Sequence, residues 1–547
     1  MAKSASPTMP RAEELIKRYD SLKSARSTWE DHWQDLADYC LPRKAEISTT
    51  KTEGQKFSAT LYDSTAVWAL QVFAAGLHSY LTNPSTKWFE LGLKNEEDET
   101  DDVKKTLKDA EDQIFRTLNS SNFNEQIHEV YLDLGCFGTA FLYEEESVEE
   151  TVRFYARPIG EIFIEENAEG RIKTVFRAFR YTVKQAYEKW GEAAGELVKK
   201  HYENKDFNKK LDFLHVIEPR DVRDVRKEDK ENKPYASCWL EYSKKHMISE
   251  GGYEEFPFMC PRYTKKSGEV YGYSNSMIVL SDIKMINAMS ETIIKASQKM
   301  VAPPLQGPHD GYILPLDTSP DAINYYLAGT QQRFEPLYDP RLHNIPIANE
   351  MLIQRREAIL KAFYADLFLL LAQSKNMTAT EVVERVQEKM LILAPVLGRL
   401  MNELLQPIIE RTFAILVRNG IIELPEEMQD MDYAIRYISP LARAQKLSES
   451  KQINEFLISL TGMINMNPEV IDNFDFDKMA RKSADIYNIS PEMIRSKEEL
   501  KQIREQRAEA QAQQAQLETA LALAKGAKDA GISLGGNNAN AAPAAKG

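Results

Sequence analysis

The sequence lacks long apolar runs. The longest, such as LFLLLA and LILAPVLG, are far shorter than the roughly 18 residues that indicate a membrane-spanning helix. The N-terminal stretch MAKSASPTMPRAEELI also lacks the apolar region of a secretory signal. We therefore expect a protein that is neither secreted nor membrane-spanning, and no membrane partner is predicted.

Cysteine is scarce as well, with 4 in 547 residues. Disulfide frameworks and metal clusters need closely and regularly spaced cysteines, and the sequence has no CxxC pair. The four are Cys40, Cys136, Cys238 and Cys260. We expect reduced, structural thiols and predict no metal and no cofactor.

Motifs of common catalytic sites are missing. No GxxxxGK[ST] sequence is present, so the loop and lysine that hold nucleotide phosphates in an ATPase are absent. His128 and Glu129 are not followed by a second histidine at the zinc-protease spacing. The tripeptide GYS at 272–274 lacks the closing glycine of a nucleophile elbow. We predict no catalytic residue and no enzyme.

Positive charge is not in excess. The chain has 69 Lys and Arg against 83 Asp and Glu, a net charge of -14. A protein that coats nucleic acid through a general basic surface would show the opposite balance, so any DNA contact must be local. The acidic run 96–102 fits a solvated loop and helix start better than a cation site.

What the sequence does contain is a long helical pattern near its middle. Residues 351–371 carry apolar side chains at three- and four-residue spacing, which predicts one amphipathic helix. After the polar break AQSKNM, residues 378–420 begin with TATE, a capping-box pattern, and predict a second helix that ends at a glycine. Pro395 and Pro407 should bend this second helix.

The remaining segments predict a mainly α protein with α+β lobes. Residues 151–275 shift to a period of two, which indicates a sheet region with inserted helices. Residues 301–346 are rich in proline, glycine and aspartate and predict a small irregular insert. Further helices are expected at 11–40, before Asn83-Pro84, up to about Asn119, and at 123–134, 277–300 and 496–525.

Four stretches resemble the portal (head-to-tail connector) proteins of short-tailed bacteriophages. They are WEDHWQDLADYCLPRK, LYDSTAVWALQVFAAGLHSYLTNPSTKWFEL, VYGYSNSMIVLSDIKMINAMSETIIKASQKMVAPPL and MTATEVVERVQEKMLILAPVLGRLMNELLQPIIERTFAILVRNG. The resemblance covers nearly all of residues 11–450. It departs in one turn, where the family commonly has an arginine and a proline and this chain has Tyr273 and Asn275.

The resemblance implies an elongated subunit that forms a dodecameric ring with a central channel. The implied parts are a wing at 1–275, a first stem helix at 276–300, a clip at 301–346, a second stem helix at 347–372, a tunnel loop at 373–377, a long kinked wing helix with its following connection at 378–439, a crown at 440–495, a C-terminal barrel helix at 496–525 and a disordered tail at 526–547.

The resemblance also implies the function. The ring would occupy one capsid vertex of the virion, pass double-stranded DNA during packaging and ejection, and be assembled in the host cytoplasm. Its implied partners are the terminase large subunit, tail adaptor proteins, and the major capsid and scaffolding proteins. A mostly acidic ring with few basic positions would let DNA slide, because neutralising about 6 to 10 phosphates already gives strong binding.

Three groups of candidate site residues follow, each with a plainer alternative. The tunnel loop would contact DNA, or be an ordinary exposed connection; it comprises Gln373, Ser374, Lys375, Asn376 and Met377. The lysine stripe of the first stem helix would face the channel, or solvent outside the stem; it comprises Lys284, Lys295 and Lys299. The clip aromatics would anchor partners, or pack their own small core; they are Tyr312, Tyr325, Tyr326 and Phe334.

Two other classes of protein remain as alternatives. A non-viral helical scaffold would show the same amphipathic patterns without the ordered set of family-like stretches. A DNA-packaging ATPase would need the phosphate-binding loop that the sequence lacks.

Overall fold

The computed structural model describes residues 11–50, 54–56, 61–94, 100–227, 229–301, 305–306, 335–336, 345–372, 393–425, 428, 433–437, 455–460, 473–486, 493–495 and 497–529. The chain divides into two compact units. The first comprises Met1–Lys94 and Leu107–Gln445, and the second Asn95–Thr106 and Lys446–Gly547.

Four helices open the described chain, and the sequence predicted each of them. They are α1 (Arg11–Cys40), α2 (Thr65–Leu81), α3 (Asp101–Ser120) and α4 (Phe123–Phe137). Helices α2 and α4 pack closely, because Gly135 has no side chain: a Cβ there would lie 2.7 Å from Leu70 and 2.8 Å from Phe73. The aromatic face of α1 is a core face, as Trp33 is fully buried.

The period-two region forms an antiparallel five-stranded sheet in the order β4-β5-β6-β7-β8. Its strands are β4 (Ile162–Glu166), β5 (Ile172–Thr182), β6 (Lys210–Pro219), β7 (Tyr235–Glu241) and β8 (His246–Tyr253). One face packs against α1 around Tyr19 and Phe176. The other face packs against α5 (Val183–Trp190) and α6 (Glu196–Glu203) around Phe213. Helices therefore cover both faces of this sheet.

The body of the first unit also contains two smaller sheets. One has the order β3-β2-β9, and the other pairs β1 with β12. Their strands are β1 (Phe89–Leu93), β2 (Leu142–Ser147), β3 (Thr151–Ala156), β9 (Phe258–Met259) and β12 (Tyr433–Tyr437). The turn into β2 follows Gly138, whose φ of +75° favours glycine.

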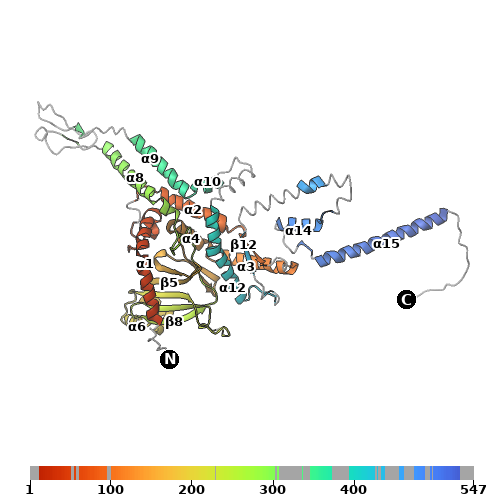
Figure 1. The fold of residues 1–547 in the computed structure, drawn as a ribbon, viewed down its shortest axis with the longest axis horizontal. Coiled ribbons are helices and arrows are strands. Elements are labelled where there is room, and N and C mark those ends of the chain that lie inside the picture. Colours follow the sequence, from red (N-terminus) through yellow and green to blue (C-terminus); the bar gives the residue numbers. More distant parts are fainter. Residues whose placement is uncertain are drawn as a thin grey trace, which may run out of the picture. The chain divides into compact units, whose positions relative to one another are not determined.

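A helical hairpin follows the sheets, and Figure 1 shows its two long helices side by side. The chain enters through α7 (Asn275–Ile278), runs along α8 (Leu280–Val301) and returns along α9 (Ile345–Ala362). Between them only the short strands β10 (Leu305–Gln306) and β11 (Glu335–Pro336) are described, as an antiparallel pair. The hairpin matches the helix pair that the sequence placed on either side of an irregular insert.

The single helix predicted over 351–371 is wrong in one detail. The structure breaks it into α9 and α10 (Ala365–Ala372) at Tyr364, which has a φ of +55°. The break lets the buried Phe363 and Phe368 both pack near Phe73 of α2, where Gly76 makes room. Packing against α2 thus overrides the helical pattern.

The predicted bend of the second long helix is partly described. Residues 393–400 are helical, Met401–Leu405 form a π-helical turn, and α12 (Gln406–Arg418) follows. The π turn ends two residues before Pro407, whose missing N–H prevents a regular helical hydrogen bond. The helix stops at Gly420 (φ +67°), as predicted. The turn before Pro395 lies outside the described residues.

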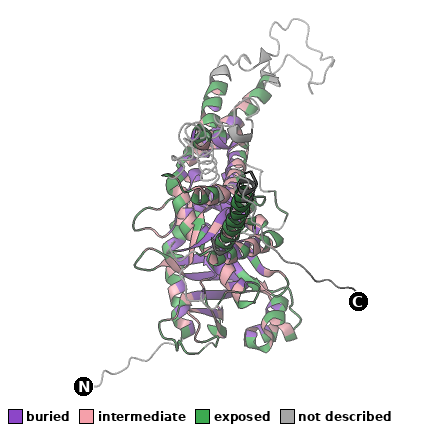
Figure 2. Cartoon of the chain, turned by 90° about the vertical axis from the view of Figure 1, so that its right-hand side faces the viewer, coloured by how far each residue is buried: buried purple, intermediate pink, exposed green. Residues whose placement is uncertain are grey.

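The second unit contains α14 (Phe476–Ile486) and α15 (Lys497–Asp529). Arg504 of α15 donates two hydrogen bonds to Asp477 of α14, at 2.6 and 2.7 Å. Nearly every described side chain of α15 is exposed (Figure 2). The predicted helix at 496–525 is confirmed. The predicted tail at 526–547 begins too early, because α15 continues to Asp529.

The four cysteines are free and buried, as expected of structural thiols. None of the described helices is long and apolar enough to cross a membrane. Within the described ranges, no group of three or more His, Cys, Asp or Glu side chains is placed to hold a metal ion.

Candidate functional site

The root of the α8–α9 hairpin is held by a tight turn against the body of the first unit. The Ser274 hydroxyl accepts a hydrogen bond from the backbone N–H of Met277 and donates one to the carbonyl of Cys136 at 2.7 Å. The Gly272 N–H donates to Thr139 at 2.8 Å, and a Cβ on Gly272 would lie 2.3 Å from the Gly138 carbonyl. This turn therefore sets where the hairpin begins.

A group of polar contacts, which we call the root clamp, fixes both helices to the segment before α2. The side-chain oxygen of Asn287 on α8 accepts hydrogen bonds from the backbone N–H groups of Tyr62, at 2.7 Å, and Asp63, at 3.3 Å. Arg356 of α9 donates to the Asp63 carboxylate at 2.8 Å. One short segment therefore holds α8 and α9 together.

The charge of Asp63 suits this role. Burial alone would raise its pKa, but hydrogen bonds from Thr65 and Arg356 outweigh burial and leave the pKa below its ordinary value. The carboxylate is thus ionised and holds Arg356. A second ion pair, between Arg355 of α9 and Asp282 of α8 at 2.7 Å, ties the helices to each other.

Beyond the root, the hairpin exposes apolar side chains on both helices. Ile353 of α9 is 53% exposed and Ile294 of α8 is 44% exposed. Others of the same kind are Met300 and Met351, and Met285 is exposed at the level of the root. In Figure 2 the body of the first unit is rich in buried residues, whereas much of the hairpin is exposed. Apolar side chains grouped on a projecting element are typical of a surface that binds another protein.

The three candidate lysines share one stripe of α8 but not one environment. Lys284 lies 2.8 Å from Asp35 of α1 and over the ring of Tyr39, so it belongs to the root. Lys295 is exposed and pairs with Glu291 of its own helix at 2.6 Å. Lys299 is exposed and has no ion pair with any residue that the structure describes. Lys299 is therefore the one of the three whose charge has no ion-pair partner among the described residues.

The other two groups of predicted site residues lie outside the described residues. They are the tunnel loop (Gln373, Ser374, Lys375, Asn376 and Met377) and the clip aromatics (Tyr312, Tyr325, Tyr326 and Phe334). Both stay predictions. Of the acidic run 96–102, only residues 100–102 are described.

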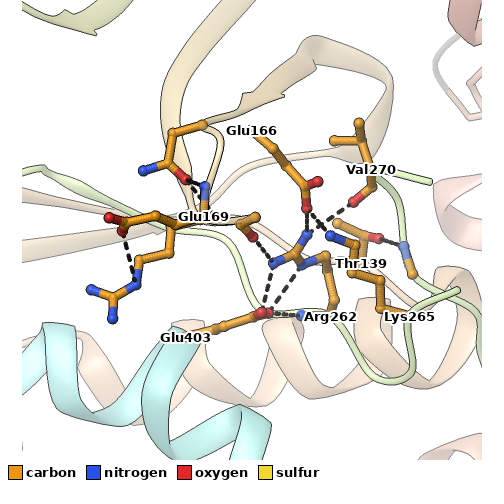
Figure 3. A network of polar contacts seen from close by, with 11 residues as sticks. Thr139, Glu166, Glu169, Arg262, Lys265, Val270 and Glu403 are labelled. Carbon is orange, nitrogen blue, oxygen red and sulfur yellow. Dashed lines mark hydrogen bonds and ion pairs between the residues drawn. The ribbon is translucent and has the colours of Figure 1, made fainter. Parts of the chain in front are cut away.

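The π turn of the second long helix is bound to the sheet region by a polar network (Figure 3). Glu403 of that turn accepts from the Arg262 backbone at 2.9 Å and from its guanidinium at 2.6 Å. The same guanidinium contacts Glu166 of β4 and the Gly170 carbonyl, and Lys265 also pairs with Glu166. The Arg262 side chain is only 3% exposed, so this network fixes the bend of the helix relative to the sheet.

A second contact further along the same helix involves a buried acid. Thr412 of α12 donates to Glu144 of β2 at 2.9 Å, and Arg411 donates to the Glu144 carbonyl. Burial raises the pKa of Glu144 to about 8, although Arg411 and Thr412 oppose the rise. Glu144 is thus largely protonated at neutral pH.

Sequence reasoning missed the root clamp and the Arg262 network. Their partners are far apart in the chain: Asn287 is 225 residues from Tyr62, and Arg262 is 141 residues from Glu403. Single polar residues on helical patterns give no signal of such partners. The only sequence signal near these contacts came from the prolines, because they mark positions where the second long helix cannot keep its regular hydrogen bonds.

This arrangement, a mixed α/β body with a projecting helical hairpin and a bent long helix bound to its sheets, agrees with the subunit type that the sequence suggested. The family described as "Bacteriophage head to tail connecting protein" matches residues 12–494. The chain therefore belongs to the family of bacteriophage head-to-tail connecting proteins, the portal proteins. The match extends beyond 450, so the family likeness reaches further than the sequence analysis placed it.

Two relatives match nearly the whole chain. The chain is 33% identical over 520 residues to a probable portal protein of Bordetella phage BPP-1, covering 92% of each. It is 29% identical over 527 residues to the portal protein of Salmonella phage epsilon15, covering 94% of each. The prediction of a phage portal protein is confirmed, and a non-viral scaffold is set aside.

Proposed function

We propose that twelve copies of this chain form a closed ring at one capsid vertex, with a channel for double-stranded DNA during packaging and ejection. The observation that carries the proposal is the hairpin, which is fixed by the root clamp and exposes apolar side chains beyond it. Helices presented side by side around an axis supply head-to-tail contacts that close a ring. We further propose that the ring is assembled in the host cytoplasm and has no enzymatic activity.

Electron microscopy of the purified full-length protein tests the ring. Closed rings of twelve subunits with an axial opening are expected. Monomers or open filaments at every concentration tested would contradict the proposal. ATP hydrolysis that persists through purification and is lost on a point substitution would contradict the absence of enzymatic activity.

Within this ring, the tunnel loop at 373–377 and the outer lysines of α8 are the proposed DNA contacts. Lys295 and Lys299 are exposed, whereas Lys284 is engaged with Asp35, so we assign DNA contact to the outer pair first. A few basic positions give weak, salt-dependent contacts that position DNA without holding it fast.

The lysine assignment is tested by packaging DNA into shells built with the variant K295Q/K299Q. Leakage should increase and depend more steeply on salt than in a matched K284Q variant. Equal yield and retention across salt concentrations, with intact rings, would exclude the outer lysines. Deleting residues 374–376 applies the same test to the tunnel loop, where K375A should give a milder effect.

We propose that the clip at 301–346 binds the terminase large subunit and later the tail adaptor proteins, while the body meets the major capsid and scaffolding proteins. The support is the position of this insert between α8 and α9. Aspartate substitutions at Tyr312, Tyr325, Tyr326 and Phe334, one at a time, should weaken motor binding in pull-down while leaving rings intact. Unchanged binding for all four would contradict the assignment.

A further inference from the structure

A cavity of about 200 Å³ lies between the five-stranded sheet, helix α5 and the small β3-β2-β9 sheet. On the large sheet, the cross-strand neighbours Arg177, His215 and Trp239 line it. On the small sheet, the neighbours Tyr155, Tyr143 and Phe258 form the facing row. Alternation along each strand places these side chains on one face, so the cavity results directly from the register of the two sheets.

The lining is rich in positive charge. Its cationic side chains are Arg157, Arg177 and Lys189, whereas Glu145 is the one acidic side chain among the described lining residues. Arg177 is paired with Glu161 at 3.0 Å. Neither Arg157 nor Lys189 has an ion pair with any residue in the described ranges. A local excess of cations in a chain of net charge -14 needs an explanation.

Within the part of the chain that the structure describes, Arg157 combines an unpaired charge with an unsatisfied buried donor. Its Nε is buried and has no hydrogen-bond acceptor among the described residues. Its guanidinium lies over the rings of Tyr155, at 4.4 Å, and Tyr143, at 5.7 Å. Stacking on rings supports the cation but leaves the buried donor unsatisfied, and a buried donor without an acceptor is costly.

Burial and positive neighbours dominate the electrostatics of the lining. Burial lowers the pKa of Arg157 and the nearby Arg177 lowers it further, and together they outweigh the opposing effect of Glu161. The pKa of His215 is held well below its ordinary value by burial and by the three cations, so its ring is neutral. This neutral ring stacks on Trp239 at 3.7 Å and shares a hydrogen bond with Ser237.

Aromatic side chains surround these charges. The amine of Lys189 lies 4.1 Å from the centre of the Trp239 ring at the cavity edge. The rings of Tyr143 and His215 meet edge to face across the two rows, with centroids 6.5 Å apart. A planar group packs favourably against the aromatic side chains of this lining, and an anionic group suits the guanidinium of an arginine. The space far exceeds the roughly 10–15 Å³ that one water occupies, and it suits a small molecule.

We propose that this cavity is a binding site for a small anion of the phosphate or carboxylate class that carries a planar group. The anionic group accepts hydrogen bonds from the Arg157 guanidinium and is attracted by the positive charge of Lys189. The planar group lies against the aromatic rows. The site is formed within one subunit and does not depend on the ring or on the DNA channel.

The proposal is tested by thermal unfolding of the full-length protein at constant ionic strength. The probes are phenyl phosphate, benzoate, inorganic phosphate and uncharged phenol. Phenyl phosphate or benzoate should raise the unfolding temperature in a saturable way, inorganic phosphate less, and phenol not at all. No saturable shift with either aromatic anion at millimolar concentration would overturn the proposal.

Two variants locate the binding, each with a matched control. R157Q should weaken aromatic-anion binding by about tenfold or more, because a charge-assisted bond is lost, whereas the exposed R180Q on β5 should not. K189Q should weaken it less, and K184Q on the same helix should not. Equal binding to R157Q and wild type, or equal loss in the control variants, would overturn the assignment. If R157Q fails to fold, the K189Q and K184Q pair decides.

Discussion

The five-stranded sheet region and the α8–α9 hairpin are stabilised in different ways. The sheet buries its apolar side chains against helices of its own chain on both faces. The hairpin is fixed at its root by Asn287, Asp63 and Arg356, while Ile294 and Ile353 remain exposed further out. The sheet region therefore carries its own core, whereas the hairpin leaves apolar side chains of both its helices exposed.

This difference separates two kinds of residue in a subunit of a ring. Residues of the sheet core should affect folding of each chain before any assembly. Residues of the outer hairpin should affect assembly with little effect on folding. Substitutions in the sheet region therefore test folding of the single chain, and substitutions in the outer hairpin test assembly.

The largest expected effect is in the sheet core. Phe176 is fully buried between the sheet and α1, and Phe176→Ala should reduce the free energy of unfolding by about 3–5 kcal/mol. Chemical unfolding followed by tryptophan fluorescence measures it, with V222A on an exposed loop as the control. A loss no larger than that of V222A would show that the sheet lacks an independent core.

The buried acid Glu144 predicts a pH dependence of the same region. Its folded pKa of about 8 exceeds the ordinary 4.5, so the folded state keeps a proton that the unfolded chain releases between these values. Its contribution to stability is therefore complete below about pH 4.5 and falls as pH rises to 8, by at most about 1.4 kcal/mol per pH unit.

Glu144→Gln should remove this dependence and stabilise the protein at pH 8 relative to wild type. Unfolding at a series of pH values measures it, and the exposed Glu146→Gln is the control. If wild type and E144Q showed parallel profiles between pH 5 and 8, Glu144 would be ionised in the folded state.

A smaller effect is expected where the bent helix meets the sheet. Glu403→Ala removes a partner of the buried Arg262, which keeps Glu166, so the loss should be about 2–3 kcal/mol. The exposed Glu410→Ala on the same helix should change stability little. Equal stability of the two variants would mean that the π turn is held by packing alone.

Local pattern was enough to predict most elements but not their partners. The helix at 11–40 and the stop at Gly420 follow from periodicity and glycine chemistry, and the structure agrees at both. The break at Tyr364 was missed because packing of Phe363 and Phe368 near α2 decides it, not local preference. Family likeness supplied the function, since no residue pattern by itself indicates a DNA channel.

The candidate site was less predictable than the fold for a physical reason. The lysine stripe of α8 was visible as a helical spacing, but the spacing does not show that Lys284 meets Asp35 on a distant helix. Charges on one stripe thus differ in accessibility according to what packs beside each turn. A sequence reports the face on which a charge lies, and only the fold reports its partner.

The smallest effect on the subunit should come from the outer hairpin. Ile353 is 53% exposed, so Ile353→Asp should change the free energy of unfolding of the isolated chain by no more than about 0.5 kcal/mol. In the assembled ring the same change would bury a charge against a neighbouring subunit, so assembly should be lost or strongly reduced. Light scattering and microscopy measure assembly, while circular dichroism confirms the fold. Exposed Ile458→Asp, in the second unit, is the control for adding a charge. Intact rings from I353D would show that this face of α9 stays in solvent, and the contrast between a self-contained sheet and a neighbour-dependent hairpin would then rest on α8 alone.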